Sequence, residues 1–211
     1  MGRHLTITLL AAVQFLAFAA CSETKEFDDH ADWENRNRAF IESIADSCDI
    51  YLNQGIDITN ASAGQMFRLT SFKLDPSKEW GRSYGYVYCR VITNGDGTES
   101  PYITDSIRIN YRARLIPTVN YPEGEIVDQS YKTDRLDPSV NVPASYQVSG
   151  LIDGVVTALL HMHTGDHWIL YIPQQMAYGS TSKTLIPKYS ALVFEINLTQ
   201  FARTGKNLPP R

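Results

Sequence analysis

The chain has 211 residues, of which 43% are hydrophobic and 20% charged, and its formal net charge is −4. These values are typical of one globular domain with an extension, or of two small domains. Lys and Arg are scattered along the chain and form no basic stripe, so the composition gives no indication of nucleic-acid binding.

Residues 1–20 have the pattern of a secretory signal peptide. Arg3 precedes an apolar run from Leu5 to Ala20, which is near the length of a signal core and short for a membrane span. The run ends in Phe-Ala-Ala-Cys, which resembles a bacterial lipobox, with Phe18 in place of the usual Leu. In a lipobox Cys21 would be acylated, for example with palmitate, and would become the mature N-terminus. An ordinary cleaved signal that ends near a cysteine is the alternative.

A polar stretch at 21–32 directly follows this cysteine, as expected of a lipoprotein tether. Two or three acyl chains together give stable membrane anchoring, where one chain alone would be marginal. We therefore expect a lipid-anchored protein of the bacterial cell envelope, most simply at the outer membrane. Which face of that membrane carries the anchor stays open.

Residues 33–52 are predicted to form a helix. Apolar residues recur there at three- and four-residue spacing, Asp32 or Asp29 is predicted to cap the start of the helix, and Gly55 stands where a helix commonly ends. The apolar stripe can pack on the rest of the chain or on a second copy of itself. A homodimer through this helix is therefore one of two alternatives.

The two cysteines that follow the tether, Cys48 and Cys89, are too few to define a disulfide framework. Cys48 falls on the apolar face of the predicted helix, and Cys89 falls in a predicted strand. Two buried free thiols are slightly favoured over a disulfide.

The rest of the chain indicates a mostly antiparallel sheet with one short helix across it, an α+β arrangement. Alternation of apolar and polar residues and high β-propensity mark the strands. The predicted strands are a short one at 66–74, one before a glycine turn at 94–97, and others at 106–115, 145–152, 166–173 and 190–201. The predicted helix is an apolar stretch at 154–165, which Gly165 ends.

Conventional catalytic groups are not recognisable. His161, His163 and His167 lie close in sequence, but Gly165 separates the third from the first two, and no carboxylate or cysteine completes a zinc-like set. We therefore expect no metal. There is no Gly-x-Ser-x-Gly elbow and no phosphate or dinucleotide loop, so no cofactor is expected either.

Six strings carry a specific resemblance instead. They are SIRINYRARL, GEIVDQS, SYQVSGLIDG, HTGDHWILYIP, MAYG and LIPKYSALVFEINL, which occur in this order between residues 106 and 198. Their order and spacing resemble those of FKBP-type peptidyl-prolyl cis–trans isomerases, over roughly residues 85–201. The resemblance implies a five- or six-stranded antiparallel sheet that curls around a short helix.

The resemblance also implies a set of pocket residues. Those in catalytic positions are Tyr111, Asp128, Ile152 through its backbone N–H, Tyr178 through its hydroxyl, and Phe194. Those in substrate-binding positions are Val127, Leu151, Val155, Leu185 and Ile186. Proline-containing polypeptides would be the partners.

Several residues depart from the family pattern and thin the aromatic part of this pocket. Val155 replaces the tryptophan of the pocket floor, and Val127 replaces a phenylalanine. The other departures are Ala144 for a larger apolar residue, Lys188 for a second proline, and Arg112-Ala113 where a glycine is usual.

The expected function is thus a peptidyl-prolyl isomerase that assists the folding of exported proteins. A non-catalytic peptide-binding, chaperone or assembly module with the same fold is the alternative. The predicted division of the chain is a signal peptide at 1–20, a tether at 21–32, a helical extension at 33–84, the FKBP-like domain at 85–203 and a tail at 204–211.

Overall fold

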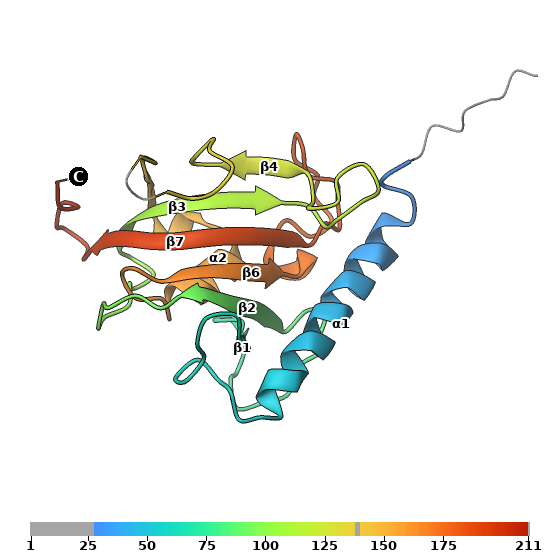
Figure 1. The fold of residues 1–211 in the computed structure, drawn as a ribbon, viewed down its shortest axis with the longest axis horizontal. Coiled ribbons are helices and arrows are strands. Elements are labelled where there is room, and N and C mark those ends of the chain that lie inside the picture. Colours follow the sequence, from blue (N-terminus) through green and yellow to red (C-terminus); the bar gives the residue numbers. More distant parts are fainter. Residues whose placement is uncertain (1–27, 138–139, 211) are drawn as a thin grey trace, which may run out of the picture.

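The computed structural model describes residues 28–137 and 140–210, which form one antiparallel sheet with a helix on each face (Figure 1). The predicted signal peptide, Cys21 and most of the tether lie outside the described residues. The α+β class is confirmed. The sheet has seven strands, rather than the five or six implied by the family resemblance.

Two helices, seven strands and two 3₁₀ turns follow one another along the described part of the chain. They are α1 (Trp33–Leu52), β1 (Met66–Thr70), β2 (Tyr86–Thr93), β3 (Ser106–Arg114), β4 (Ile126–Gln129), β5 (Ala144–Gln147), the 3₁₀ turn η1 (Val148–Gly150), α2 (Asp153–Leu159), β6 (His167–Ile172), the 3₁₀ turn η2 (Gln174–Met176) and β7 (Leu192–Ala202).

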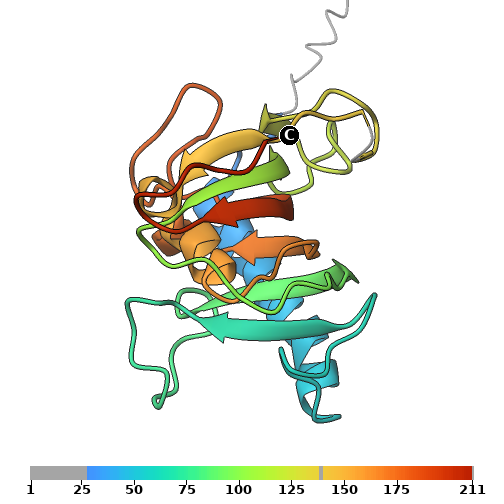
Figure 2. The same ribbon diagram turned by 90° about the vertical axis from the view of Figure 1, so that its left-hand side faces the viewer.

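The sheet order is β1-β2-β6-β7-β3-β4, and β5 also pairs with β3 (Figure 2, from β1 in teal at the bottom to β5 in gold). Residues 106–109 of β3 pair with β5 and residues 112–114 pair with β4, so these two strands lie one after the other along the same edge. The two strands on either side of the predicted glycine turn, β2 and β3, are not neighbours, because β6 and β7 lie between them.

Alternate side chains of each strand face different helices, as the two-residue period of a strand requires. In β2, Val87 and Cys89 pack with the α2 cluster, whereas Tyr86 and Tyr88 pack with the α1 cluster. The sheet therefore has two apolar faces. α2 covers one of them, and α1 crosses the other obliquely near one end of the strands (Figure 1).

The predicted N-terminal helix is present with the expected bounds, Trp33–Leu52, but its predicted cap is wrong. Asp32 stands at the cap position in a left-handed conformation and makes no capping hydrogen bond; its carboxylate accepts from Asn35 instead, at 2.6 Å. The carboxylate of Asp29, the other candidate, accepts from Asn120. α1 packs on the sheet of its own chain, the first of the two alternatives that its pattern left open.

Two predicted elements are shorter in the structure. The strand predicted at 145–152 ends at Gln147, where the chain turns through η1 into α2. The helix predicted at 154–165 ends at Leu159, because the amides of both His161 and Met162 donate to the Ala158 carbonyl and close a turn. Met162 is fully buried, so the apolar pattern continued past the end of the helix.

Cys48 and Cys89 are both buried and free, as the sequence slightly favoured. They lie on opposite faces of the sheet, Cys48 in the α1 cluster and Cys89 in the α2 cluster. Burial raises the pKa of Cys48 to about 12 and that of Cys89 well above its ordinary value. Among the described helices, none is long and apolar enough to cross a membrane.

Candidate active site

A cavity of about 440 Å³ opens on the α2 face of the sheet, between β3, β7 and the start of α2. Its lining residues are Ile109, Tyr111, Asp128, Tyr146, Gly150, Leu151, Ile152, Val155, Ala177, Tyr178 and Phe194. Seven of the ten residues that the family resemblance placed in the pocket are among them. The size is within the ordinary range for a site that binds a small molecule or a short peptide segment.

Tyr111 sits at a discontinuity of the sheet edge. It lies between the residues of β3 that pair with β5 and those that pair with β4. Its amide therefore donates to the side chain of Ser130, at 2.9 Å, rather than to a neighbouring strand. On its other side Tyr111 pairs with Ile196 of β7, and its ring projects from the α2 face of the sheet into the cavity lining.

The hydroxyl of Tyr111 lies in a hydrogen-bonded group at the rim of the cavity. It donates to Asp128 Oδ2 at 2.8 Å, and the Tyr146 hydroxyl lies 2.9 Å away. The other carboxylate oxygen of Asp128 accepts the Gln129 amide. Burial, followed by these hydrogen bonds to Tyr146 and Asp128, raises the pKa of Tyr111, so its hydroxyl stays protonated and its orientation is fixed.

Tyr178 contributes a second phenol to the cavity, on the loop that follows η2. Burial raises its pKa, and the negative charge of Asp128 adds to the effect. Tyr178 is therefore neutral at physiological pH and able to donate a hydrogen bond. The Lys183 ammonium lies 5.2 Å from the centroid of its ring, within the range of a cation–π contact.

Ile152 supplies a backbone donor at the base of the cavity. It precedes the first turn of α2 with extended dihedrals (φ −65°, ψ 149°), and its carbonyl accepts the Val156 amide. No acceptor among the described residues takes a hydrogen bond from its own N–H. Such an unpaired N–H beside a helix start is a ready donor for a bound carbonyl.

The apolar part of the cavity has one aromatic wall and an aliphatic floor. Phe194 stacks on Tyr111, with the ring centroids 6.1 Å apart and the planes 18° from parallel. Val155 is 2% exposed and lies with Ile109 beneath the opening. Val155 is thus part of the lining at the position that the family resemblance assigned to a tryptophan.

Three residues predicted in the pocket lie outside its lining. Val127 packs with the α1 cluster, since it alternates with Asp128 along β4. Ile186 is buried in the same α1 cluster. Leu185 is 52% exposed. The order of the strings placed these residues near the site, but the direction of each side chain depends on the fold.

Four lining residues were not predicted, namely Ile109, Tyr146, Gly150 and Ala177. Tyr146 is the most informative of them, because its hydroxyl contacts that of Tyr111. The alternation of apolar and polar side chains along β5 could have predicted it, since this alternation directs Ala144 and Tyr146 to the α2 face of the sheet.

Arg112, one of the departures from the family pattern, lies next to the site on the other face of β3. It is 4% exposed, and its guanidinium lies 4.4 Å from the centroid of the Tyr131 ring. It also donates to the Gln129 side chain and to the carbonyls of Thr133 and Asp134. Arg112 thereby holds the loop that follows β4 rather than entering the cavity.

The three histidines do not converge. His163 faces Asp166, His167 contacts Glu195 at 2.9 Å, and burial lowers the pKa of His161. The part of the chain that the structure describes contains no group of three metal-ligating side chains.

Comparison with known proteins assigns the residues that line the cavity to a known family. Residues 97–199 match the family model described as FKBP-type peptidyl-prolyl cis-trans isomerase, and this segment includes every residue of the cavity lining. The chain belongs to the FKBP-type peptidyl-prolyl cis–trans isomerase family. The matched segment leaves out α1, β1 and β2.

Individual relatives share only part of this FKBP-type chain. The FKBP-type 22 kDa peptidyl-prolyl cis-trans isomerase of Escherichia coli is 37% identical over 53% of this chain and 48% of its own length. The outer membrane protein MIP of Legionella longbeachae is 30% identical over 52% of this chain and 41% of its own. The chain thus spans about half the length of these curated relatives.

Among solved structures, a peptidyl-prolyl cis-trans isomerase from Pseudomonas syringae is 30% identical, with a TM-score of 0.45. The match covers 56% of this chain and 76% of the other.

Proposed function

We propose that this protein catalyses cis–trans isomerisation of X-Pro peptide bonds in the cavity on the α2 face. The observation that carries the proposal is the convergence of an apolar wall with two oriented donors, the Tyr178 hydroxyl and the unpaired Ile152 N–H. Family membership supports it, since the family model that matches residues 97–199 and the relative from Escherichia coli both have this activity in their names.

The chemistry needs no nucleophile. Rotation about the amide is slow because resonance must be broken, at a cost of ~18–20 kcal/mol. A site that binds the twisted amide better than the planar one lowers this barrier. Twisting reduces charge separation in the amide, so the apolar surface formed by Phe194, Val155 and Ile109 favours the twisted state.

The polar groups then orient the flanking peptide. The Ile152 N–H and the Tyr178 hydroxyl would each hold a substrate carbonyl, so that rotation is confined to the X-Pro bond. Tyr111 would present one edge of its ring to the proline, with its hydroxyl held by Asp128. No proton has to be transferred in this scheme, which agrees with the raised pKa of both tyrosines.

The aliphatic floor lowers the expected rate. A large aromatic side chain buries ~150–250 Å². Replacing a tryptophan with Val155 would remove on the order of 100 Å² of contact, worth ~2–3 kcal/mol at most. We therefore propose an isomerase slower by one or two powers of ten than members with an aromatic floor.

We further propose that the protein acts on exported polypeptides at the bacterial cell envelope. The signal-like pattern of residues 1–20 and the lipobox-like Cys21 support this location, and one relative is named as an outer membrane protein. Mass spectrometry of the protein from its native membrane would test for acyl chains on Cys21. A homodimer through α1 stays a prediction, to be tested by sedimentation.

The isomerase is tested with the protein from residue 22 onward and a short X-Pro peptide, by measuring cis–trans relaxation. Tyr178→Phe and Asp128→Val should each lower kcat/KM, whereas Tyr102→Phe, at a tyrosine 62% exposed and outside the cavity lining, should leave it unchanged. A wild-type rate equal to the uncatalysed background would refute the proposal. Rates above background that neither variant lowers would place the site elsewhere.

The small side chain of Val155 supports the alternative, a peptide-binding protein without isomerase activity. If the floor is too small to stabilise a twisted amide, the cavity would still bind an extended peptide through Ile152 and Tyr178. In that case peptide binding would be lost in Tyr178→Phe while the wild-type relaxation rate equals the background.

A further inference from the structure

The loop that carries Tyr178 returns to the sheet through residues 186–191, which we call the rim segment. Its last residues contact α1, although α1 lies on the opposite face of the sheet from the cavity. The Asn37 side chain accepts the Ala191 amide at 2.7 Å, and its NH₂ group donates to the Trp33 carbonyl. Asn37 is 2% exposed, so both bonds are shielded from water.

Trp33 makes a second buried bond to the rim segment. Its indole Nε1–H donates to Ser190 Oγ at 2.8 Å, and the Ser190 hydroxyl in turn donates to the Pro187 carbonyl at 2.6 Å. The last two residues of the rim segment are thereby bonded to the N-terminal part of α1, and Pro187 is linked to it through the Ser190 hydroxyl. Neither Trp33 nor Asn37 lines the cavity of about 440 Å³ that contains Tyr178, and neither falls within the segment that matches the family model.

The rim segment is also bonded to the residue that follows Tyr178. The Tyr189 amide donates to the Gly179 carbonyl at 2.7 Å, and the Gly179 amide donates to the Gln174 carbonyl at 2.9 Å. Gly179, with φ +58°, is therefore held on one side by the rim segment and on the other by η2. The backbone position of Tyr178 depends on both.

Tyr189 has a backbone conformation that needs external support. Its φ is +64°, in the left-handed region that a bulky residue rarely adopts. Such conformations persist where the surrounding structure determines them, and they cluster at functional sites. The hydrogen bonds that Trp33 and Asn37 make with the next two residues, Ser190 and Ala191, stabilise the backbone of Tyr189 in this conformation.

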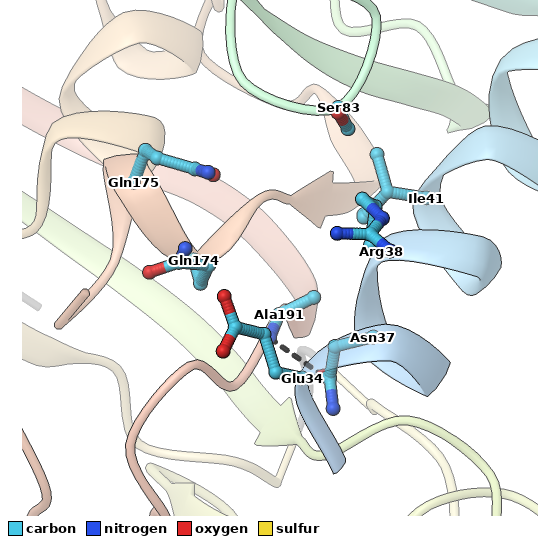
Figure 3. Close-up of a pocket in the computed structure, with 8 residues that line it drawn as sticks. All are labelled: Glu34, Asn37, Arg38, Ile41, Ser83, Gln174, Gln175 and Ala191. Carbon is cyan, nitrogen blue, oxygen red and sulfur yellow. Dashed lines mark hydrogen bonds between the residues drawn. The ribbon is translucent and has the colours of Figure 1, made fainter. Parts of the chain in front are cut away.

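Direct packing between α1 and η2 is incomplete, so these bonds matter more. A cavity of about 70 Å³ separates them, lined by Glu34, Asn37, Arg38, Ile41, Ser83, Gln174, Gln175 and Ala191. Figure 3 shows the Asn37–Ala191 hydrogen bond at its edge, while the side chains of Gln174 and Gln175 lie apart from the helix. The helix reaches the Tyr178 loop through the rim segment rather than through η2.

We propose that Trp33 and Asn37 are positioning residues for the Tyr178 hydroxyl, so that α1 sets the geometry of a cavity it does not touch. The kinetic part of this inference rests on the proposed isomerase function. A small displacement of a substrate-binding group by a distant change is sufficient to lower a rate by an order of magnitude or more.

The first test compares Asn37→Ala with Asn37→Asp. The alanine variant loses the acceptor for the Ala191 amide, whereas the aspartate variant keeps it. Burial beside the Trp33 carbonyl favours the protonated carboxyl, which can also replace the donor to that carbonyl. We expect kcat/KM for the X-Pro peptide to fall about 10-fold in Asn37→Ala and to recover most of this loss in Asn37→Asp. Amide exchange at Tyr189 should accelerate in the alanine variant alone.

The second test is a double-mutant cycle from both ends of the other bond. Trp33→Phe keeps a buried ring without the N–H, and Ser190→Ala removes the hydroxyl. Because both changes break the same bond, the double variant should lose little more activity than Ser190→Ala alone. Effects that multiply would contradict the proposal.

Arg82→Ala is the matched control for a general loosening of α1. Arg82 pairs with Glu42, Asp46 and Asp49, from the middle of α1 towards its C-terminal end, and not with the residues that contact the rim segment. It should leave kcat/KM and Tyr189 exchange unchanged. An equal loss in Arg82→Ala and Asn37→Ala would reduce the effect to helix stability and overturn the inference.

Hydrogen exchange of the backbone amides tests the positioning role independently of the proposed isomerase activity. Unchanged exchange at Tyr189 in Asn37→Ala overturns the positioning role whatever the activity. Accelerated exchange with an unchanged kcat/KM overturns it as well. If the wild-type rate equals the background, the isomerase proposal fails, and exchange at Tyr189 and Gly179 alone decides whether α1 holds the Tyr178 loop.

Discussion

The two faces of the sheet use the same strands for different purposes. On the α2 face, apolar side chains pack around the short helix and leave a cavity of about 440 Å³ that is edged by tyrosine hydroxyls. On the α1 face, the helix packs on one end of the strands and leaves about 70 Å³ beside η2, while a hollow of about 250 Å³ remains next to Ile169, Tyr171 and Val193. The contacts of α1 there include buried hydrogen bonds from Trp33 and Asn37.

This difference shows how a small domain keeps a cavity open. Unfilled volume costs stability, because the side chains that line it lose packing contacts. The packing of α1 on the other face of the same strands offsets that cost. The two faces meet at Ile152, Ala177 and Phe194, each of which packs against both clusters.

The largest expected effect is in the packing of α1 on the sheet. Ile41 is 1% exposed at the centre of α1, so Ile41→Ala should lower the free energy of unfolding by ~2–5 kcal/mol, through lost burial and the cavity left behind. Urea denaturation followed by circular dichroism measures this.

Ile50 on the same helix is the control. It is 60% exposed, and Ile50→Ala should stay within about 0.5 kcal/mol of the wild type. Equal effects of the two substitutions would mean that α1 does not pack on the sheet in solution, and the comparison of the two faces would lose its basis.

An intermediate effect is expected from overfilling the α2 face. A methyl group on Gly154 would come within 2.3 Å of Ile172 Cγ2, so Gly154→Ala should destabilise the protein by about 1–3 kcal/mol. A β-carbon at Gly150, which lines the cavity, would meet nothing within 4 Å. Gly150→Ala should be close to neutral in the same denaturation experiment, and a loss like that of Gly154→Ala would contradict an open cavity.

The smallest effect concerns Glu195, which projects away from the α2 face. The hydrogen bond from His167 is the largest cause of its lowered pKa, and the Tyr131 hydroxyl adds to it. Since the folded-state pKa lies below the ordinary value of 4.5, Glu195 stabilises the fold above that pH. This contribution is lost as the pH falls through the folded-state pKa.

Glu195→Gln should therefore remove a small part of the stability at neutral pH and flatten its decline below about pH 4.5. Unfolding free energies at pH 7 and pH 3 for the two proteins measure the difference. A decline as steep in the variant as in the wild type would assign the acid sensitivity to other carboxylates.

Much of this arrangement was predictable from local sequence. The apolar stripe at three- and four-residue spacing predicted α1 with its bounds, and period-two alternation located β2, β3, β6 and β7 to within a few residues. The six strings that resemble the family predicted that Tyr111, Asp128 and Tyr178 lie in one pocket. Each of these signals is contained in a short window of the chain.

Other features depended on which elements meet. β2 and β3 follow each other in sequence, yet β6 and β7 separate them. The Tyr146 hydroxyl reaches Tyr111 because β5 pairs with the same strand, β3.

The sequence by itself determined the class of fold, the helix at 33–52 and seven of the residues that line the cavity, because periodicity and family strings are local properties. Only the tertiary structure decided that α1 packs on its own sheet, that Val127 and Ile186 turn away from the cavity, and that Trp33 and Asn37 reach the rim segment. The spacing of apolar residues in a sequence predicts that a side chain is buried, but it does not predict which segment packs against it. Here that segment lies more than 150 residues away along the chain.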